Sequence, residues 1–154
     1  MGSYPARLHR AAHVRRDGAL ITDRRTLRSV DADAIAGLLP DHPGLRLVLL
    51  HGSRARGDGA PEADWDFGVL TDGWADLAAL ASALTGLLGT DAVDVVDLDR
   101  ASALLRYRAA RDGVALWERP AGAFLEFRLD AVRYWCDAGP VIRAAQEDVL
   151  AELG

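Results

Sequence analysis

Short apolar runs recur along the chain, separated by longer segments in which apolar residues stand three or four positions apart. Runs of about four to eight apolar residues bounded by turn residues are typical of buried β-strands, whereas the wider spacing is typical of helices with one apolar face. The runs predict four strands, at residues 45–50, 66–71, 92–98 and 114–118. We therefore expect an α+β fold in which helices pack around these strands.

Three helices are predicted before and between the strands, each introduced by an aspartate. Asp31, Asp72 and Asp99 are the expected N-caps, because a carboxylate at that position accepts hydrogen bonds from the unpaired N–H groups of the first turn. Pro40 is expected to end the first helix and Gly89 the second. The apolar stripe of the second helix consists of Leu77, Leu80, Leu84 and Leu87.

A wide apolar surface is predicted in the last part of the chain, from residue 121 onward. Helical spacing gives two adjoining apolar faces, one of Leu125, Leu129, Val132 and Cys136 and the other of Phe124, Phe127, Ala131 and Trp135. Gly139-Pro140 is expected to interrupt the helix, so we predict two C-terminal helices within residues 121–154. A face this wide is typical of packing on a sheet or on another chain. The thiol of Cys136 is expected to be buried.

The composition fits one soluble domain. The 154 residues, of which 50% are hydrophobic and 27% charged, supply enough apolar material for a core. A single cysteine cannot form an internal disulfide, which favours a reducing compartment. No run approaches the roughly 20 apolar residues of a membrane span, and the first residues lack the hydrophobic centre of a signal peptide. We therefore expect a cytoplasmic protein that does not contact a membrane.

The first 30 residues are predicted to form a basic extension, followed by one domain over residues 31–154. Residues 1–28 hold seven arginines and two aspartates, so their formal charge is about +5 on a chain whose net charge is −5. The sequence Arg15-Arg16-Asp17-Gly18 indicates a turn, which predicts a small hairpin. Because the segment has one aromatic residue and no recognition helix, we expect it to dock on the acidic domain or on a partner rather than to bind nucleic acid.

Residues suited to catalysis gather between the first two strands. Gly52-Ser53 follows the first apolar run, and Asp64 and Asp66 open the second after ten intervening residues. Alternate residues of a strand share a face, so the two carboxylates project together and can hold a divalent metal. Gly52 allows a ligand to approach the backbone closely, and amides opening a short helix there favour phosphate oxygens. Either half alone is typical of an ordinary turn or strand end, but together they predict a site for phosphate and metal.

His51 and a run of arginines have simpler interpretations. His51 stands between the first strand and Gly52, where it could contact a ligand, but we expect its side chain to make a structural hydrogen bond, since this histidine is not part of an HxxxH or CxxC spacing typical of a zinc site. Arg106, Arg108 and Arg111 could brace a triphosphate or a partner. Such a run is more commonly a solvated helix face paired with acids.

The arrangement Gly52-Ser53-x10-Asp64-x-Asp66 resembles the signature of the DNA-polymerase-β-type nucleotidyltransferase superfamily. The chain is similar in length and spacing to the minimal branch of that superfamily, which includes the MntA-type antitoxins, and the resemblance spans residues 31–118. It implies the nucleotidyltransferase (polymerase β-like) fold, with a mixed β-sheet flanked by helices.

The resemblance also implies roles for the residues of this motif. The acids would hold two Mg²⁺ ions on ATP, the substrate, while the turn and its arginines bind the β- and γ-phosphates and offset their charge. The metal ligands are then Asp64 and Asp66, and the nucleotide-binding residues are Gly52, Ser53 and Arg54 or Arg56.

A third carboxylate is expected on the strand after the two aspartates. In this superfamily it binds the catalytic metal or takes the acceptor proton. Asp94 is the predicted third carboxylate, and Asp97 is the alternative on the opposite face of the same strand.

The activity implied by the resemblance is transfer of AMP from ATP to a tyrosine of a HEPN-type RNase toxin, which neutralises the toxin. The partner is then the toxin itself, in a hetero-oligomer. One alternative is a small-molecule nucleotidyltransferase similar to aminoglycoside-modifying enzymes, which normally carry a larger acceptor-binding domain. Another is a non-catalytic antitoxin that binds nucleotide and acts by occlusion, and a third is self-modification at Tyr107 or Tyr134.

Overall fold

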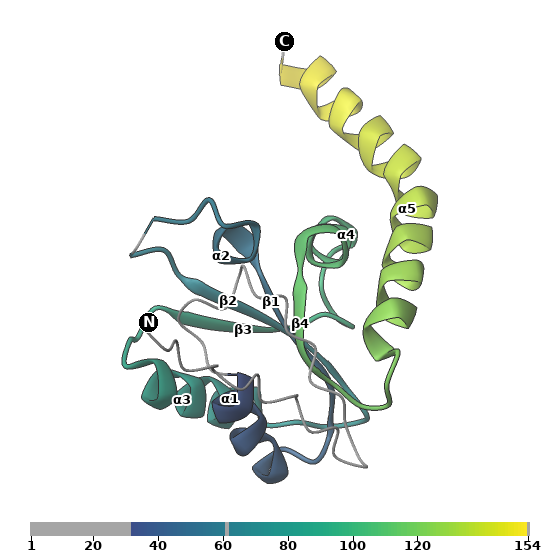
Figure 1. Cartoon of the computed structure of the whole chain (residues 1–154). Coiled ribbons are helices and arrows are strands. Elements are labelled where there is room, and N and C mark those ends of the chain that lie inside the picture. The colour runs from purple at the N-terminus through teal and green to yellow at the C-terminus, as the bar shows by residue number, and fades with distance from the viewer. Residues whose placement is uncertain (1–31, 61, 154) are drawn as a thin grey trace, which may run out of the picture.

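Four strands form one mixed sheet in the computed structural model, which describes residues 32–60 and 62–153 (Figure 1). The strands are β1 (Leu45–His51), β2 (Trp65–Thr71), β3 (Val93–Asp97) and β4 (Val114–Glu118). Their order across the sheet is β3-β2-β1-β4, with β1 antiparallel to β2 and β4, and with β2 parallel to β3. The four predicted strands are confirmed, each within one residue at either end.

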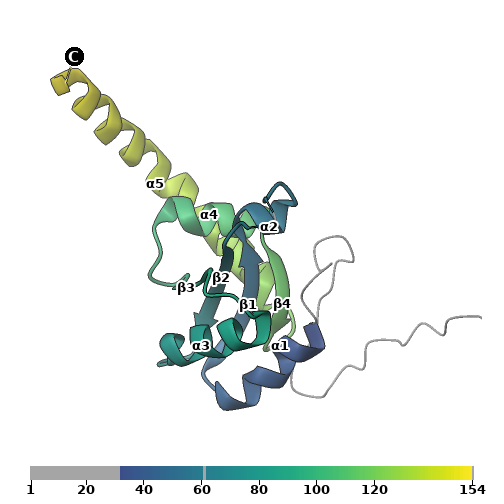
Figure 2. The ribbon, with the colours of Figure 1, turned by 90° about the vertical axis from the view of Figure 1, so that its left-hand side faces the viewer.

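Helices cover both faces of this sheet. They are α1 (Ala32–Leu38), α2 (Gly52–Arg56), α3 (Leu77–Leu88), α4 (Ala103–Asp112) and α5 (Ala123–Leu153), with a short 3-10 turn, η1 (Leu39–Asp41), after α1. Helices α1 and α3 lie on one face, and α4 and α5 lie on the other (Figures 1 and 2). The mixed sheet flanked by helices is therefore confirmed.

The unbroken apolar run of β1 reflects burial on both faces of the sheet. Val48 and Leu50 belong to the core beneath α1 and α3, whereas Leu47 and Leu49 belong to the core beneath α4 and α5. Because successive side chains of a strand alternate between faces, a strand covered on both sides has few polar positions. This buried strand is the rigid support from which the candidate site extends at His51.

Two predicted helix caps are wrong. Helix α3 is capped by Asp76, whose Oδ1 accepts a hydrogen bond from a first-turn N–H at 2.9 Å, and not by Asp72. Helix α4 is capped by Ser102 rather than by Asp99. In both cases the chain leaves its strand and crosses several further residues before it turns into the helix, so a later side chain meets the free N–H groups of the first turn.

Other helix predictions have mixed outcomes. Gly89 ends α3 as predicted, with φ +67, and α1 ends at Leu38, before the turn that contains Pro40. The apolar stripe of α3 is buried in its middle, but Leu87 is exposed. The predicted cap Asp31, the hairpin and the basic extension of residues 1–30 lie outside the described residues.

The C-terminal part of the chain forms one helix, α5, rather than the two that were predicted. Pro140 lies inside it. A proline removes the hydrogen bond of its own N–H, and nearby alanines that favour helix, Ala138, Ala144 and Ala145, continue the helix past that position. Glu118 anchors the start of α5, because its buried carboxylate accepts hydrogen bonds from the N–H groups of Gly122 and Phe124, each at 3.0 Å.

Only one of the two apolar faces predicted for this helix is packed. The face that contains Phe127 and Ala131 is buried, whereas Leu125, Leu129 and Cys136 are exposed. The predicted burial of the Cys136 thiol is therefore wrong, because α4 and the sheet cover α5 from one side only (Figure 2). Neither α5 nor any other helix in the described part of the chain combines the length and the apolar character needed to cross a membrane.

Candidate functional site

The candidate site begins where β1 runs directly into α2. His51 is the last residue of β1, and Gly52 is the first residue of α2. Gly52 has φ +71, a left-handed conformation that favours glycine. A Cβ at this position would also overlap the Oδ2 atom of Asp66. The turn therefore needs glycine for two reasons: its backbone conformation, and the space that the Asp66 carboxylate occupies against it.

Asp66 is the middle of a row of three ionisable side chains that crosses three strands. The pairing of β1 with β2 places His51 opposite Asp66, and the pairing of β2 with β3 places Asp66 beside Asp94. Residues paired in this way project from the same face of a sheet. It is the face that α4 and α5 cover, because Leu49, two residues before His51, packs in that core. Asp64, two residues before Asp66 and exposed, adds another carboxylate at the same end of the sheet.

Asp97, the alternative third carboxylate, lies toward the other end of the strands. It is paired with Val69 of β2. Its Oδ1 accepts a hydrogen bond from the Asp99 N–H at 2.9 Å, and its Oδ2 lies 3.5 Å from Nε of Arg100. The register thus brings Asp94, and not Asp97, beside Asp66, although the chemical role of Asp94 stays a prediction.

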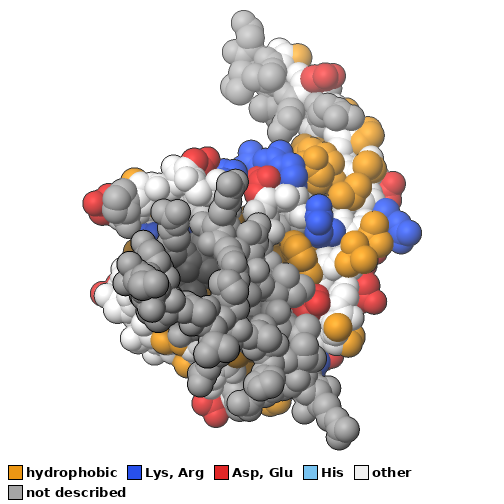
Figure 3. Space-filling view, viewed as in Figure 1, with side chains coloured by type: hydrophobic (Ala, Val, Ile, Leu, Met, Phe, Trp, Pro, Cys, Tyr) orange, Lys and Arg blue, Asp and Glu red, His pale blue; other side chains and the backbone are white. Residues whose placement is uncertain are grey.

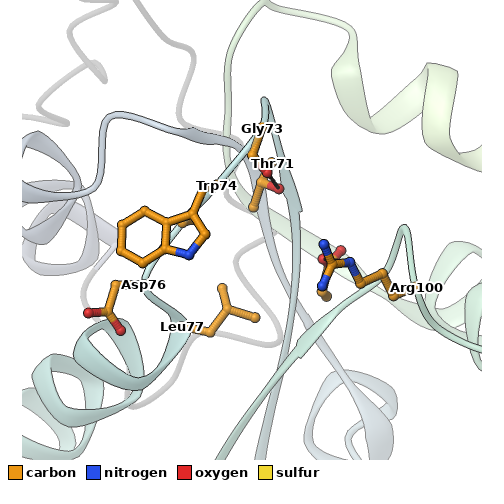
Figure 4. Close-up of a pocket in the computed structure, with 8 residues that line it drawn as sticks. Thr71, Gly73, Trp74, Asp76, Leu77 and Arg100 are labelled. Atoms are coloured by element: carbon orange, nitrogen blue, oxygen red, sulfur yellow. Dashed lines mark hydrogen bonds and ion pairs between the residues drawn. The ribbon is translucent and has the colours of Figure 1, made fainter.

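A hollow of about 350 Å³ opens at this opposite end of the sheet, next to the start of α3 (Figure 4). Trp74 and Arg100 face it from either side, and Thr71 lies at its edge. Thr71 is the last residue of β2, whereas Asp66 is near its start. The length of β2 therefore separates the hollow from the carboxylates, and the hollow is not part of the candidate site.

The structure brings most of the predicted site residues together at the α2 end of the sheet. They are Gly52, Ser53, Asp64, Asp66 and Asp94. His51 is a member of this site that the sequence did not identify, because its pairing with Asp66 depends on the strand register. The one signal in the sequence is a histidine at the end of an apolar strand, directly before Gly52.

Burial favours the uncharged forms of both His51 and Asp66. Burial raises the pKa of the Asp66 carboxyl; the charge of His51 opposes this shift, and the negative charges of Asp94 and Asp64 add to it. Burial lowers the pKa of His51, although Asp66 and Asp94 oppose that shift. Nε2 of His51 is buried and has no hydrogen-bond partner among the described residues, so that atom does not make the predicted structural hydrogen bond. A cation bound here would relieve the repulsion between the carboxylates.

The donor atoms of this cluster fit magnesium. Mg²⁺ prefers oxygen ligands and usually takes one or two carboxylates together with substrate phosphates and water. Within residues 32–60 and 62–153, no three acidic, histidine or cysteine side chains form a ready-made metal-binding group. The arrangement therefore suits an ion shared with a bound phosphate better than an ion enclosed by protein alone.

Arg54 and Arg56 make different contacts. Nε of Arg54 donates a hydrogen bond to the carbonyl oxygen of Ala63 at 2.7 Å, and its guanidinium carbon lies 4.0 Å from the centre of the Trp65 ring. Arg54 thus braces the loop between α2 and β2. Arg56 is exposed at the end of α2 and pairs with Asp58 at 3.0 Å. Its charge also acts on Asp66, so Arg56 is the better placed of the two to influence a bound anion.

The arginines of α4 follow the predicted pattern only in part. Arg111 forms two contacts of 2.7 Å with Asp112, as expected for a solvated face paired with acids. The guanidinium carbon of Arg106 instead lies 5.4 Å from the ring centre of Tyr134 and 6.0 Å from that of Phe127. Arg106 therefore belongs to the joint between α4 and α5.

Comparison with known proteins identifies the family. Residues 33–121, which contain the turn and all three carboxylates, match the family described as Polymerase beta, Nucleotidyltransferase. The protein adenylyltransferase MntA of Aphanizomenon flos-aquae (strain 2012/KM1/D3) is 36% identical over 105 residues, which are 59% of this chain and 69% of that protein.

Solved structures agree with this match. A chain of a toxin–antitoxin complex with AMP-PNP is 30% identical, has a TM-score of 0.67, and covers 79% of this chain and 99% of its own length. A chain of the complex between tri-AMPylated HEPN toxin of Shewanella oneidensis and MNT antitoxin is also 30% identical and has a TM-score of 0.60. The match covers 77% of this chain and 95% of that chain. The chain therefore belongs to the polymerase beta nucleotidyltransferase family and, within it, to the MntA-type protein adenylyltransferases.

Proposed function

We propose that this chain is an antitoxin that transfers AMP from ATP to a tyrosine of a HEPN-type RNase toxin and so neutralises the toxin. The observation that carries the proposal is the contact of Gly52 with Asp66, which sets a tight turn directly against a cluster of carboxylates. The relatives support the acceptor, since they include an MntA adenylyltransferase and a complex that contains an AMPylated HEPN toxin.

The turn at the end of β1 binds the nucleotide in this proposal. The backbone of Gly52 and the hydroxyl of Ser53 contact the β- and γ-phosphates, and Arg56, exposed at the end of α2, offsets the negative charge of these phosphates. Asp64 and Asp66 are the residues that would hold magnesium. When bound, magnesium neutralises phosphate charge and stabilises the attacking and leaving oxygens.

The transfer is a displacement at the α-phosphorus of ATP. The tyrosine oxygen forms a bond to this phosphorus, the bond to the oxygen that bridges to the β-phosphate breaks, and pyrophosphate leaves. Asp94, which is exposed beside Asp66, takes the proton of the tyrosine hydroxyl. The product carries a new negative charge and a bulky group on the toxin, both of which oppose the binding of RNA phosphates.

A protein acceptor suits the size of this domain. The described residues form the sheet and its covering helices, without an added lobe for a small-molecule acceptor, and a protein acceptor brings its own binding surface. ATP and an enzyme that cleaves cellular RNA are both found in the cytoplasm, so we expect the reaction to take place there.

The proposal is tested with purified toxin, the product of the adjacent gene, incubated with labelled ATP and magnesium. We expect label on the toxin with the wild-type chain and none with a folded variant carrying Asp64→Asn and Asp66→Asn. Labelling by that variant overturns the assigned roles. Label on Tyr107 or Tyr134 of this chain instead of the toxin indicates self-modification, and a variant that neutralises the toxin without labelling it indicates occlusion.

A further inference from the structure

Helix α5 continues beyond the sheet at the end where α2 and the candidate site lie (Figures 1 and 2). Its inner face packs on α4 and the sheet as far as Trp135, whose ring stacks on that of Tyr107 in α4 with 5.3 Å between the ring centres. Helical spacing extends the same face through Tyr134, Val141 and Ile142. Tyr134 is 49% exposed and Val141 is 69% exposed. The inner face of α5 therefore stays apolar past the point where the domain covers it.

One arginine of α4 borders this apolar face. Arg106 lies against the ring of Tyr134, and its buried Nε has no hydrogen-bond partner within the described residues. Within the described residues, Arg106 forms no salt bridge with a carboxylate. Figure 3 shows arginine side chains directly beside the hydrophobic side chains of α5. The surface thus combines exposed apolar side chains of α5 with a cation that lacks a carboxylate partner among the described residues.

This surface and the nucleotide turn lie at the same end of the sheet and on the same side of it. The row of His51, Asp66 and Asp94 projects from the face that α4 and α5 cover. The end of α4 also contacts α2. The pKa of Asp112, the last residue of α4, is lowered mainly by Arg111 and further by the charge of Arg56 at the end of α2. A protein seated against the inner face of α5 is therefore held next to the carboxylates.

We propose that the toxin docks on this surface, the α4–α5 shelf, defined as Arg106, Tyr134, Val141 and Ile142. The inference rests on the proposed function, since it names the surface that presents the acceptor to the site. The matching surface of the toxin must offer apolar side chains to α5 and acidic side chains to α4. Tyrosine and arginine are also among the residues that contribute most to binding at protein interfaces.

A second copy of this chain fits the shelf less well. A two-fold contact between identical shelves would place the positive charge of Arg106 from both copies in one interface, and like charges at an interface are unfavourable. A toxin has no such restriction. The toxin also makes a second contact where its tyrosine enters the nucleotide site. This second contact adds to the interface area that is buried at the shelf.

Exposed apolar residues on opposite faces of α5 make a matched pair of variants. Val141 is on the inner face, and Leu129, 55% exposed, is on the outer face. Binding of purified toxin is measured by calorimetry without ATP, so that no AMP transfer takes place. Val141→Glu should weaken binding at least about tenfold, whereas Leu129→Glu should change it by less than about twofold. The affinity for AMP-PNP should be the same in both variants, which shows that the domain is folded.

Several outcomes would overturn the inference. If Leu129→Glu abolishes binding and Val141→Glu does not, the toxin docks on the outer face of α5. If the isolated chain sediments as a dimer that Val141→Glu converts to a monomer, the shelf is occupied by a second copy. If the wild-type chain binds the toxin through the shelf but does not label it, the shelf is supported and the proposed activity fails. If wild type does not bind the toxin at all, both fail.

Discussion

Replacing Gly52 by alanine tests the contact on which the site is built. The change has two separable effects, because Gly52 has φ +71 and because a Cβ there overlaps Oδ2 of Asp66. A left-handed backbone at a residue with a Cβ costs roughly 1–2 kcal/mol. For a domain of this size, that loss corresponds to a fall in Tm of about 2–8 °C.

The overlap with Asp66 should affect catalysis far more than stability. The carboxylate must move away from the turn, and a displacement of about 1 Å at a reacting centre lowers a rate by on the order of 100-fold. Gly57→Ala is the matched control, because Gly57 has φ +77 and no atom lies within 4 Å of the added Cβ. This control should lose similar stability and retain AMP transfer within about threefold.

The assay is the initial rate of toxin labelling at saturating ATP, measured well below the Tm of both variants, with Tm from scanning calorimetry. Equal losses of rate in Gly52→Ala and Gly57→Ala would mean that backbone strain, and not the position of Asp66, limits the reaction. An unchanged rate in Gly52→Ala would show that the carboxylate does not need its place against the turn.

Three further predictions concern individual carboxylates. Asp94→Asn should lower AMP transfer at least about 100-fold while Asp97→Asn changes it less than about threefold, and the reverse result in the labelling assay would reject the assigned register. Asp66→Asn should raise Tm near pH 7 when magnesium and nucleotide are absent. The reason is that the pKa of the Asp66 carboxyl is raised on folding. Its carboxyl therefore favours the folded state below its unfolded pKa, and this contribution is lost as the pH rises through the folded pKa. The gain in Tm should shrink toward about pH 4, and a gain independent of pH would exclude this cause. Glu118→Ala should lower the free energy of unfolding by about 2–3 kcal/mol in urea titrations, because two N–H groups at the start of α5 lose their acceptor, and a loss below about 0.5 kcal/mol would show that water replaces the carboxylate.

The strands and the carboxylate pair could be predicted because each depends on local pattern. β1 is apolar at successive positions since both of its faces are covered, and this leaves a signal that needs no partner strand. The spacing from Gly52 to Asp66 is likewise a property of one turn and one strand start. The preference for Asp94 over Asp97 came from the family resemblance of its Val-Asp-Val-Val context, and the strand register places Asp94 beside Asp66.

The features that were missed depend on contacts between distant segments. His51 joins the row of carboxylates only through its pairing with Asp66 on another strand, and the sequence shows no such pairing. The residue that caps α3 depends on where the chain turns after β2, which the local pattern does not show, so Asp72 was predicted although Asp76 caps the helix. Pro140 was treated as a helix end, although a long helix tolerates the loss of one hydrogen bond. The exposure of Cys136 likewise depends on which side of α5 the domain covers.

The central claim is tested most directly by the mass of the adjacent gene product after coexpression with this chain. We predict that intact-protein mass spectrometry shows AMP on that product with the wild-type chain, that fragmentation locates it on a tyrosine, and that the adduct is absent when Asp64 and Asp66 are both replaced by Asn. A toxin that carries no AMP and is still neutralised by the wild-type chain would contradict the account.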